Sequence, residues 1–138
     1  IVEGPGIPYG TTIVSGTSPN FVLSNSATVA GGTTMYLRAA KKFTFNVPAS
    51  EPKDVWVRFV VRPGSARSSA TVLDYVRNGV AQRVTLNQNS GGEGGDWVLA
   101  FRGVQFQAGS PSLDAIYALT DAAGGATVIA AVELRKSA

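Results

Sequence analysis

The chain of 138 residues contains no cysteine and no histidine. Their absence excludes disulfide-stapled scaffolds, thiol nucleophiles, imidazole bases and the zinc sites that need these ligands. Its apolar runs are a handful of residues long, far below the roughly 20 that a membrane-spanning helix needs, so we expect no membrane insertion. The composition therefore favours a protein that is not an enzyme and that carries no cofactor or metal ion.

Charge is sparse and dispersed along the chain. Asp and Glu number 9 against 12 Lys and Arg, a mildly basic balance. The arginines lie singly, at positions 38, 58, 62, 67, 77, 83, 102 and 135. Nucleic-acid-binding surfaces need clustered positive charge, so this dispersion indicates that the protein does not bind nucleic acid.

Alternation of apolar and polar residues predicts β-strands along most of the chain. In the clearest case Val55, Val57 and Phe59 share one face of a strand, whereas Trp56 and Arg58 share the other. The core residues predicted from alternation are Val55, Val57, Phe59, Phe43, Phe45, Val84 and Leu86. Further strands are expected at residues 11–15, 21–23, 33–37, 97–106, 113–120 and 126–135. No segment shows sustained helical periodicity, which indicates an all-β protein.

Turn residues separate these strands and indicate how they connect. Asn78 and Gly79 lie between two alternating segments and predict a hairpin with a type I′ turn, since both positions tolerate positive φ. Short strands with connections of mixed length predict an antiparallel two-sheet β-sandwich of jelly-roll type. We expect a single domain over residues 1–138, in which residues 33–138 form the main sandwich. Residues 1–32, rich in Gly, Ser, Thr and Pro, are predicted to wrap its edge in extended form.

Residues 84–138 also carry a spaced pattern of apolar and turn residues. A strand ending in Asn-Gln leads through a glycine-rich loop to a Trp, an apolar strand, an Ala-Gly-Ser turn and a closing Val-Ile-Ala. The residues of this pattern are Leu86, Asn87, Gln88, Trp97, Leu99, Phe101, Phe106, Ala108, Gly109, Ser110, Val128, Ile129, Ala130 and Val132. The pattern resembles the closing half of the golvesin C-terminal-like domain, also described as the carbohydrate-binding domain of xanthan-lyase type.

The resemblance implies a secreted bacterial accessory module, often attached to polysaccharide-degrading or surface proteins, whose task is glycan binding. Two departures from the family pattern limit what can be transferred. Ala131 stands at or next to the place of an aspartate in the closing motif, so no role of that aspartate carries over. The loop before Trp97 is also longer and contains Glu93 and Asp96.

Sugar recognition needs flat aromatic faces bordered by planar hydrogen-bonding side chains. The candidates of these types are Trp56, Arg58, Arg62, Tyr75, Asn87, Gln88, Asp96 and Trp97. Trp56 is expected on the polar face of its strand beside Arg58. Two interpretations of Trp97 stay open. In a regular strand Trp97 would face the same side as Leu99 and Phe101, which favours a position in the core. Its place after a glycine-rich loop instead favours an aromatic ring that stacks on a sugar.

Two functions from different classes fit these features. The first is a non-catalytic carbohydrate-binding module that binds a polysaccharide or oligosaccharide through aromatic side chains, with arginines that would suit an acidic glycan. The second is a structural or interaction module, such as an adhesin, spacer or virion-type sandwich, without sugar binding. The resemblance implies that the module is secreted or at the cell surface and attached to a larger protein. The carboxylates of residues 91–96 lack the regular spacing of calcium-binding loops.

Overall fold

The computed structural model describes residues 1–17, 20–28, 35–59, 67–89, 97–120 and 127–138, and every regular element in them is a β-strand. The strands are β1 (Val2–Glu3), β2 (Ile13–Thr17), β3 (Asn20–Leu23), β4 (Tyr36–Leu37), β5 (Ala40–Phe43), β6 (Glu51–Phe59), β7 (Thr71–Arg77), β8 (Val80–Leu86), β9 (Trp97–Phe106), β10 (Ala115–Leu119) and β11 (Ile129–Lys136). In this described part, no helix has the length and apolar character needed to cross a membrane.

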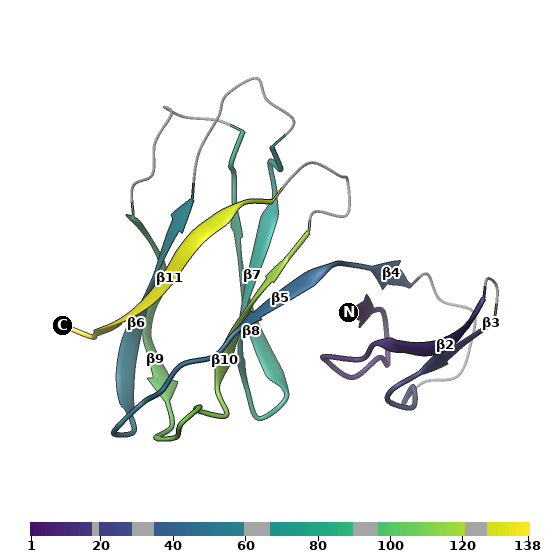
Figure 1. Ribbon diagram of the computed structural model, residues 1–138, viewed down its shortest axis with the longest axis horizontal. Coiled ribbons are helices and arrows are strands. Elements are labelled where there is room, and N and C mark those ends of the chain that lie inside the picture. Colours follow the sequence, from purple (N-terminus) through teal and green to yellow (C-terminus); the bar gives the residue numbers. More distant parts are fainter. Residues whose placement is uncertain (18–19, 29–34, 60–66, 90–96, 121–126) are drawn as a thin grey trace.

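Strands β5 to β11 form a sandwich of two antiparallel sheets, with strand orders β5-β10-β7-β8 and β11-β6-β9 (Figure 1). Outward along the chain from the β7–β8 hairpin, β6 pairs with β9 and then β5 pairs with β10. The hairpin and the β5–β10 pair lie in one sheet, whereas the β6–β9 pair lies in the other. This nesting is the connectivity of a jelly roll, and β11 extends the second sheet beyond β6. The predicted fold class, an all-β antiparallel two-sheet sandwich, is confirmed.

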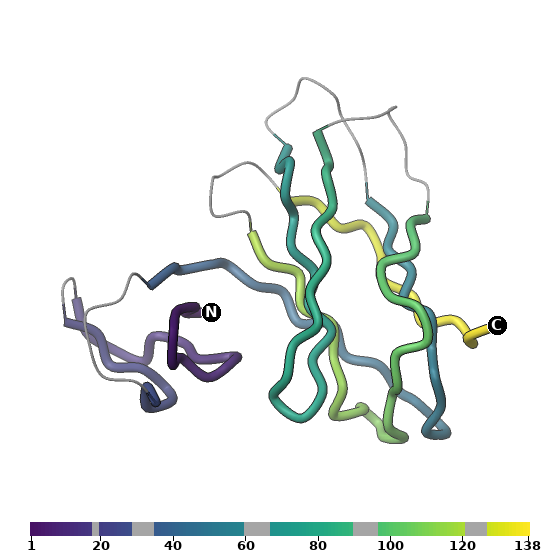
Figure 2. The backbone as a smooth tube through the Cα atoms, turned by 180° about the vertical axis from the view of Figure 1, so that it is seen from behind, coloured from purple at the N-terminus to yellow at the C-terminus, as the bar shows by residue number. Residues whose placement is uncertain are grey.

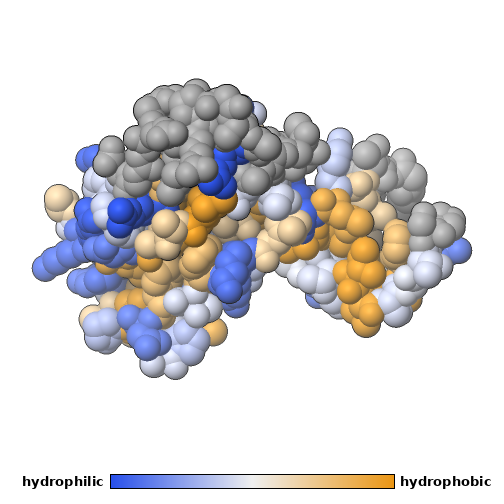
Figure 3. Space-filling model, turned by 45° about the horizontal axis from the view of Figure 1, so that its top comes forward, coloured by the Kyte–Doolittle hydropathy of each residue, from blue (hydrophilic) through white to orange (hydrophobic). Residues whose placement is uncertain are grey.

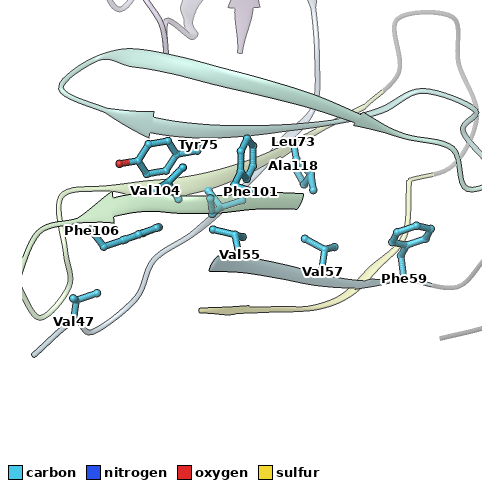
Figure 4. Packing of buried hydrophobic residues seen from close by; sticks show 11 residues of the cluster. Val47, Val55, Val57, Phe59, Leu73, Tyr75, Phe101, Val104, Phe106 and Ala118 are labelled. Atoms are coloured by element: carbon cyan, nitrogen blue, oxygen red, sulfur yellow. The ribbon is translucent and has the colours of Figure 1, made fainter. Parts of the chain in front are cut away.

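The core lies between the two sheets and is built from their inward-facing side chains (Figure 4). Its buried members are Val47, Val55, Val57, Phe59, Leu73, Tyr75, Phe101, Val104, Phe106, Ile116 and Ala118. Partly buried side chains that pack against them include Phe43, Phe45, Val84 and Leu86. The predicted burial is therefore confirmed for Val55, Val57 and Phe59, whereas the other four predicted core residues lie at the margin of the core. Burial of each large apolar side chain stabilises the fold by about 1.5–3 kcal/mol.

The turn of the β7–β8 hairpin has the predicted backbone. Asn78 has a φ of 52° and Gly79 a φ of 75°, so both residues occupy the left-handed region that a type I′ turn requires. A β-carbon at Gly79 would meet no atom within 4 Å. Any cost of a substitution there must therefore come from the backbone conformation and not from crowding.

Replacing Gly79 with valine is expected to lower the free energy of unfolding by about 1–2 kcal/mol, because a β-branched residue resists positive φ. Gly79→Asn is the matched control and should cost less, since asparagine tolerates this conformation. Urea denaturation of both variants measures the difference. Equal losses would contradict a turn that depends on positive φ.

Strands β1 to β4 lie beside the sandwich as two short ribbons, β1–β4 and β2–β3 (Figures 1 and 2). We call residues 1–17, 20–28 and 35–37 the N-terminal lobe, and β2–β3 the apolar ribbon. The described part of residues 1–32, predicted to wrap the sandwich edge, contains β1 and the apolar ribbon. The ribbon projects away from the sandwich in both views.

Polar contacts hold the base of the lobe on the sandwich. Glu3 forms ion pairs with Arg38, at 2.7 Å, and with Arg83 of β8. The Tyr9 hydroxyl donates a hydrogen bond of 2.8 Å to the fully buried carboxylate of Asp74 in β7. Burial and this carboxylate raise the pKa of Tyr9 well above its ordinary value, so the hydroxyl keeps its proton and remains a donor. The Tyr9 ring also packs edge-on against Tyr117, with 5.4 Å between ring centroids.

Candidate functional site

The outer face of the β11-β6-β9 sheet carries both tryptophans of the chain. Trp56 of β6 and Trp97 of β9 lie on neighbouring strands, and the guanidinium of Arg135 in β11 lies over both rings. The guanidinium carbon is 4.7 Å from the Trp56 ring centroid and 5.2 Å from that of Trp97, within cation–π range. Both tryptophans are partly buried. We call this surface, formed by Trp56, Arg58, Trp97, Leu99, Glu133 and Arg135, the tryptophan face.

A β-bulge explains how Trp97 reaches the outer face. Phe101 lies opposite Val55, whereas Leu99 lies opposite Trp56, so Ala100 is an extra residue between two consecutive pairs. The extra residue reverses, from this point on, which alternate side chains of β9 face the core and which face outward. Phe101 consequently points into the core, while Leu99 and Trp97 point out. The core interpretation of Trp97 is wrong, because simple alternation assumes a strand without a bulge.

Arg135 was not among the candidates drawn from the sequence. Its outward orientation follows from the inward-facing Val132 and Leu134, which pack against the core. Alternation could therefore have predicted that Arg135 faces outward. The pairing of β11 with β6, which brings Arg135 to the Trp56 ring, joins segments far apart in the chain and has no local signal.

Exposed and partly exposed charges surround the two rings. The Nε atom of Arg135 donates a hydrogen bond of 3.0 Å to Glu133, and this ion pair lies at the surface. Such exposed pairs contribute about 0–1 kcal/mol, so Arg135 can exchange Glu133 for another anion at little cost. Arg58 is exposed on the same face, opposite Trp97. Asp54 is engaged elsewhere, since it accepts hydrogen bonds from the Gly103 amide and the Ser137 hydroxyl.

Tyr75 lies inside the sandwich and not on a binding platform. Its side chain is 7% exposed and packs against the rings of Phe101 and Phe106. Its hydroxyl donates a hydrogen bond to the carbonyl oxygen of Gln105. Burial raises the pKa of Tyr75. The prediction that Tyr75 belongs to a sugar-binding platform is wrong, because its side chain points into the core, as that of Leu73 does two residues earlier.

Gln88 is likewise a structural residue. Its fully buried amide accepts hydrogen bonds from the Thr71 hydroxyl, at 3.0 Å, and from the Val128 amide, at 3.1 Å. Its Nε2 donates to the carbonyl oxygen of Val128 at 2.6 Å. The side chain thus links the end of β8 to the segment that enters β11. These partners occupy the amide, so Gln88 does not offer it to a ligand.

The remaining candidates do not join the tryptophan face. Asn87 is exposed at the end of β8, in the opposite sheet, where its Oδ1 accepts a hydrogen bond from the Asn89 amide. Arg62 and Asp96 lie outside the described residues, as does the acidic loop of residues 91–96. In the portion of the chain that is described, no group of three acidic side chains is placed to share a metal ion.

Comparison with known proteins gives no match: no family model, no curated protein and no solved structure matches this chain. The resemblance of residues 84–138 to the golvesin C-terminal-like domain therefore stays a prediction. What the protein does has to be inferred from its own surfaces.

Solvent access to the two rings can be measured in single-tryptophan variants. Trp97→Phe leaves only Trp56, and Trp56→Phe leaves only Trp97. Acrylamide is expected to quench the fluorescence of both variants, because both indoles lie on the outer face. Substitution of either tryptophan by alanine should cost about 1–2 kcal/mol, below the 3–5 kcal/mol of a buried aromatic. A Trp97 ring that acrylamide cannot reach would contradict this placement.

Proposed function

We propose that this protein is a non-catalytic carbohydrate-binding module that binds a polysaccharide across the tryptophan face. The observation that carries the proposal is the placement of Trp56, Trp97 and Arg135 together on an outer sheet face. Outer faces of antiparallel sheets are usually polar, and two adjacent indoles there need a reason other than the core. Indole faces stack on the apolar C–H surfaces of sugar rings.

The charges of the face favour an acidic polysaccharide. Arg135 lies over both rings, so a sugar that stacks on them must move this guanidinium aside, where a carboxylate of the sugar would bind it in place of Glu133. Arginine binds carboxylates through two parallel hydrogen bonds, which also fix the orientation of the sugar. Arg58, opposite Trp97, places a second positive charge on the same surface. We place the module in a larger secreted or cell-surface bacterial protein, as the resemblance of its closing half implies.

Affinity electrophoresis in gels that contain alginate, an acidic polymer, or dextran, a neutral one, tests the proposal. The native protein is expected to be retarded by alginate more than by dextran. Trp56→Ala and Trp97→Ala should each weaken retention at least about tenfold, equivalent to about 1.4 kcal/mol. Arg135→Gln should weaken retention by alginate and leave any retention by dextran unchanged.

Leu113→Ala is the matched control, because Leu113 is an apolar side chain that is 86% exposed outside the tryptophan face. This variant should bind as the native protein does. Retention that survives the loss of both tryptophans would place the binding surface elsewhere. A native protein that is retarded by no polysaccharide in a broad panel would overturn sugar binding altogether.

A second function, that of an interaction module, is supported by a separate observation. Seven large apolar side chains of the N-terminal lobe are exposed: Ile13, Val14, Phe21, Val22, Met35, Tyr36 and Leu37. Figure 3 shows hydrophobic residues gathered on this lobe. Contiguous exposed apolar surface is typical of protein-binding sites. Sedimentation of the native protein over a range of concentrations tests this function without any sugar.

A further inference from the structure

We propose that the apolar ribbon of one copy of this chain inserts into a groove at the edge of the sandwich of a second copy, so that copies join head to tail. The inference rests on the interaction function above and does not depend on sugar binding. It is carried by two surfaces of the same molecule that no described strand covers, the ribbon and the groove.

The apolar ribbon has the surface of a buried element. No charged residue occurs between Glu3 and Arg38, a stretch of 34 residues in a chain with 15% charged residues. Val14 and Val22 are 64% and 56% exposed, although the ribbon also carries Phe21 among the apolar side chains that line a hollow of the lobe. A two-stranded ribbon is marginally stable alone, and natural sheet edges usually carry charges that prevent pairing. The ribbon's sequence has no protective charges, and none of the described strands forms a second layer over its valines.

The groove lies where the two sheets of the sandwich open. Strands β5 and β11 are each the first strand of their sheet, with one edge that no described strand pairs. Between them is a groove of about 390 Å³. It is lined by Ala39, Ala40, Lys41, Phe43, Ala118, Thr120, Thr127 and Ile129. Three small alanines leave this space at the margin of the core, and a strand added along β5 or β11 would fill it.

The chemistry of the two surfaces selects a second copy as the occupant. Among the described residues that line the groove, Lys41 is the one charged side chain, so a segment with several charges would lose hydration there without matching partners for all of them. The ribbon brings no charge. Four of the seven exposed apolar side chains of the lobe belong to the ribbon, namely Ile13, Val14, Phe21 and Val22, and insertion into the groove would remove them from water.

The anchoring of the lobe makes the contact intermolecular. Ion pairs of Glu3 with Arg38 and Arg83 hold the base of the lobe on its own sandwich, and the ribbon projects away (Figures 1 and 2). A ribbon that inserts into the next copy leaves that copy's own ribbon available. Such a heterologous contact produces open chains or closed rings of copies.

Two surface variants test the contact by complementation. Val14→Asp with Val22→Asp places charges on the ribbon, and Ala40→Arg blocks the groove. Both change exposed residues, and circular dichroism verifies that each variant retains the β-sheet spectrum of the native protein. In sedimentation velocity the native protein is expected to assemble with rising concentration, whereas each variant alone stays monomeric. An equimolar mixture should form a heterodimer and nothing larger, because one intact ribbon meets one intact groove.

Val80→Asp is the matched control, since Val80 is 71% exposed at the β7–β8 hairpin, and it should assemble as the native protein does. Trp56→Ala should also assemble, which separates this inference from the sugar proposal. A native protein that stays monomeric at every concentration would overturn the inference. Assembly of the groove variant alone would indicate contact between ribbons and would also overturn it. A mixture that forms no heterodimer would do the same.

Discussion

Replacement of Gln88 by alanine is expected to lower the free energy of unfolding by about 3 kcal/mol. The amide is fully buried and bonds to the Thr71 hydroxyl and to both backbone groups of Val128. Truncation leaves these groups buried without partners and opens a cavity between the end of β8 and the entry to β11. Both effects act in the same direction.

Asn87→Ala is the natural control, because it changes the neighbouring amide residue. Asn87 is exposed and accepts one local hydrogen bond from Asn89, so its loss should cost less than about 1 kcal/mol. Urea denaturation followed by circular dichroism measures both variants. Equal losses at the two positions would show that the Gln88 amide does not link the two strands.

Replacement of Asp74 by alanine is expected to cost about 2–4 kcal/mol, because it removes a fully buried carboxylate that holds two elements together. Asp74 accepts two hydrogen bonds of 2.8 Å from the Arg83 guanidinium and one from the Tyr9 hydroxyl. Without it, Tyr9 loses its acceptor and the base of the N-terminal lobe loses a contact with β7. The expected cost stays below that of a fully buried pair, since the Arg83 side chain is 37% exposed and can turn to water.

Two measurements separate this effect from a general loss of stability. Denaturation should show a much smaller cost for Glu133→Gln, which breaks an ion pair at the surface, typically worth less than about 1 kcal/mol. Limited proteolysis should cleave the N-terminal lobe of the Asp74→Ala protein faster than the sandwich. An unchanged cleavage pattern would contradict the role of Asp74 in holding the lobe.

The elements that the sequence predicted well are those whose signal is local. Alternation over Val55, Val57 and Phe59 identified the inward face of β6, because side chains of a regular strand point alternately to opposite sides. The turn at Asn78 and Gly79 was predictable for a similar reason, since few residues accept positive φ at two successive positions.

The candidate site was predictable only in part. The alternation of β6 predicted that Trp56 and Arg58 face outward, and the structure places both on the tryptophan face. The prediction that Tyr75 and Gln88 bind a ligand is wrong, since both side chains are buried. The sequence does not reveal whether the polar group of such a side chain bonds to water or to a buried partner. Only the tertiary arrangement supplies the Gln105 carbonyl for one and the Val128 backbone for the other.

By itself, then, the sequence determined an all-β sandwich, the inward faces of its regular strands and its central hairpin, since each depends on the chemistry of neighbouring residues. The tertiary structure decided the extra residue at Ala100, which turns Trp97 outward, and the pairing of β11 with β6, which brings Arg135 over both indoles. A bulge and a strand pairing are set by how distant segments fit around a shared core. No local pattern of residues contains that information.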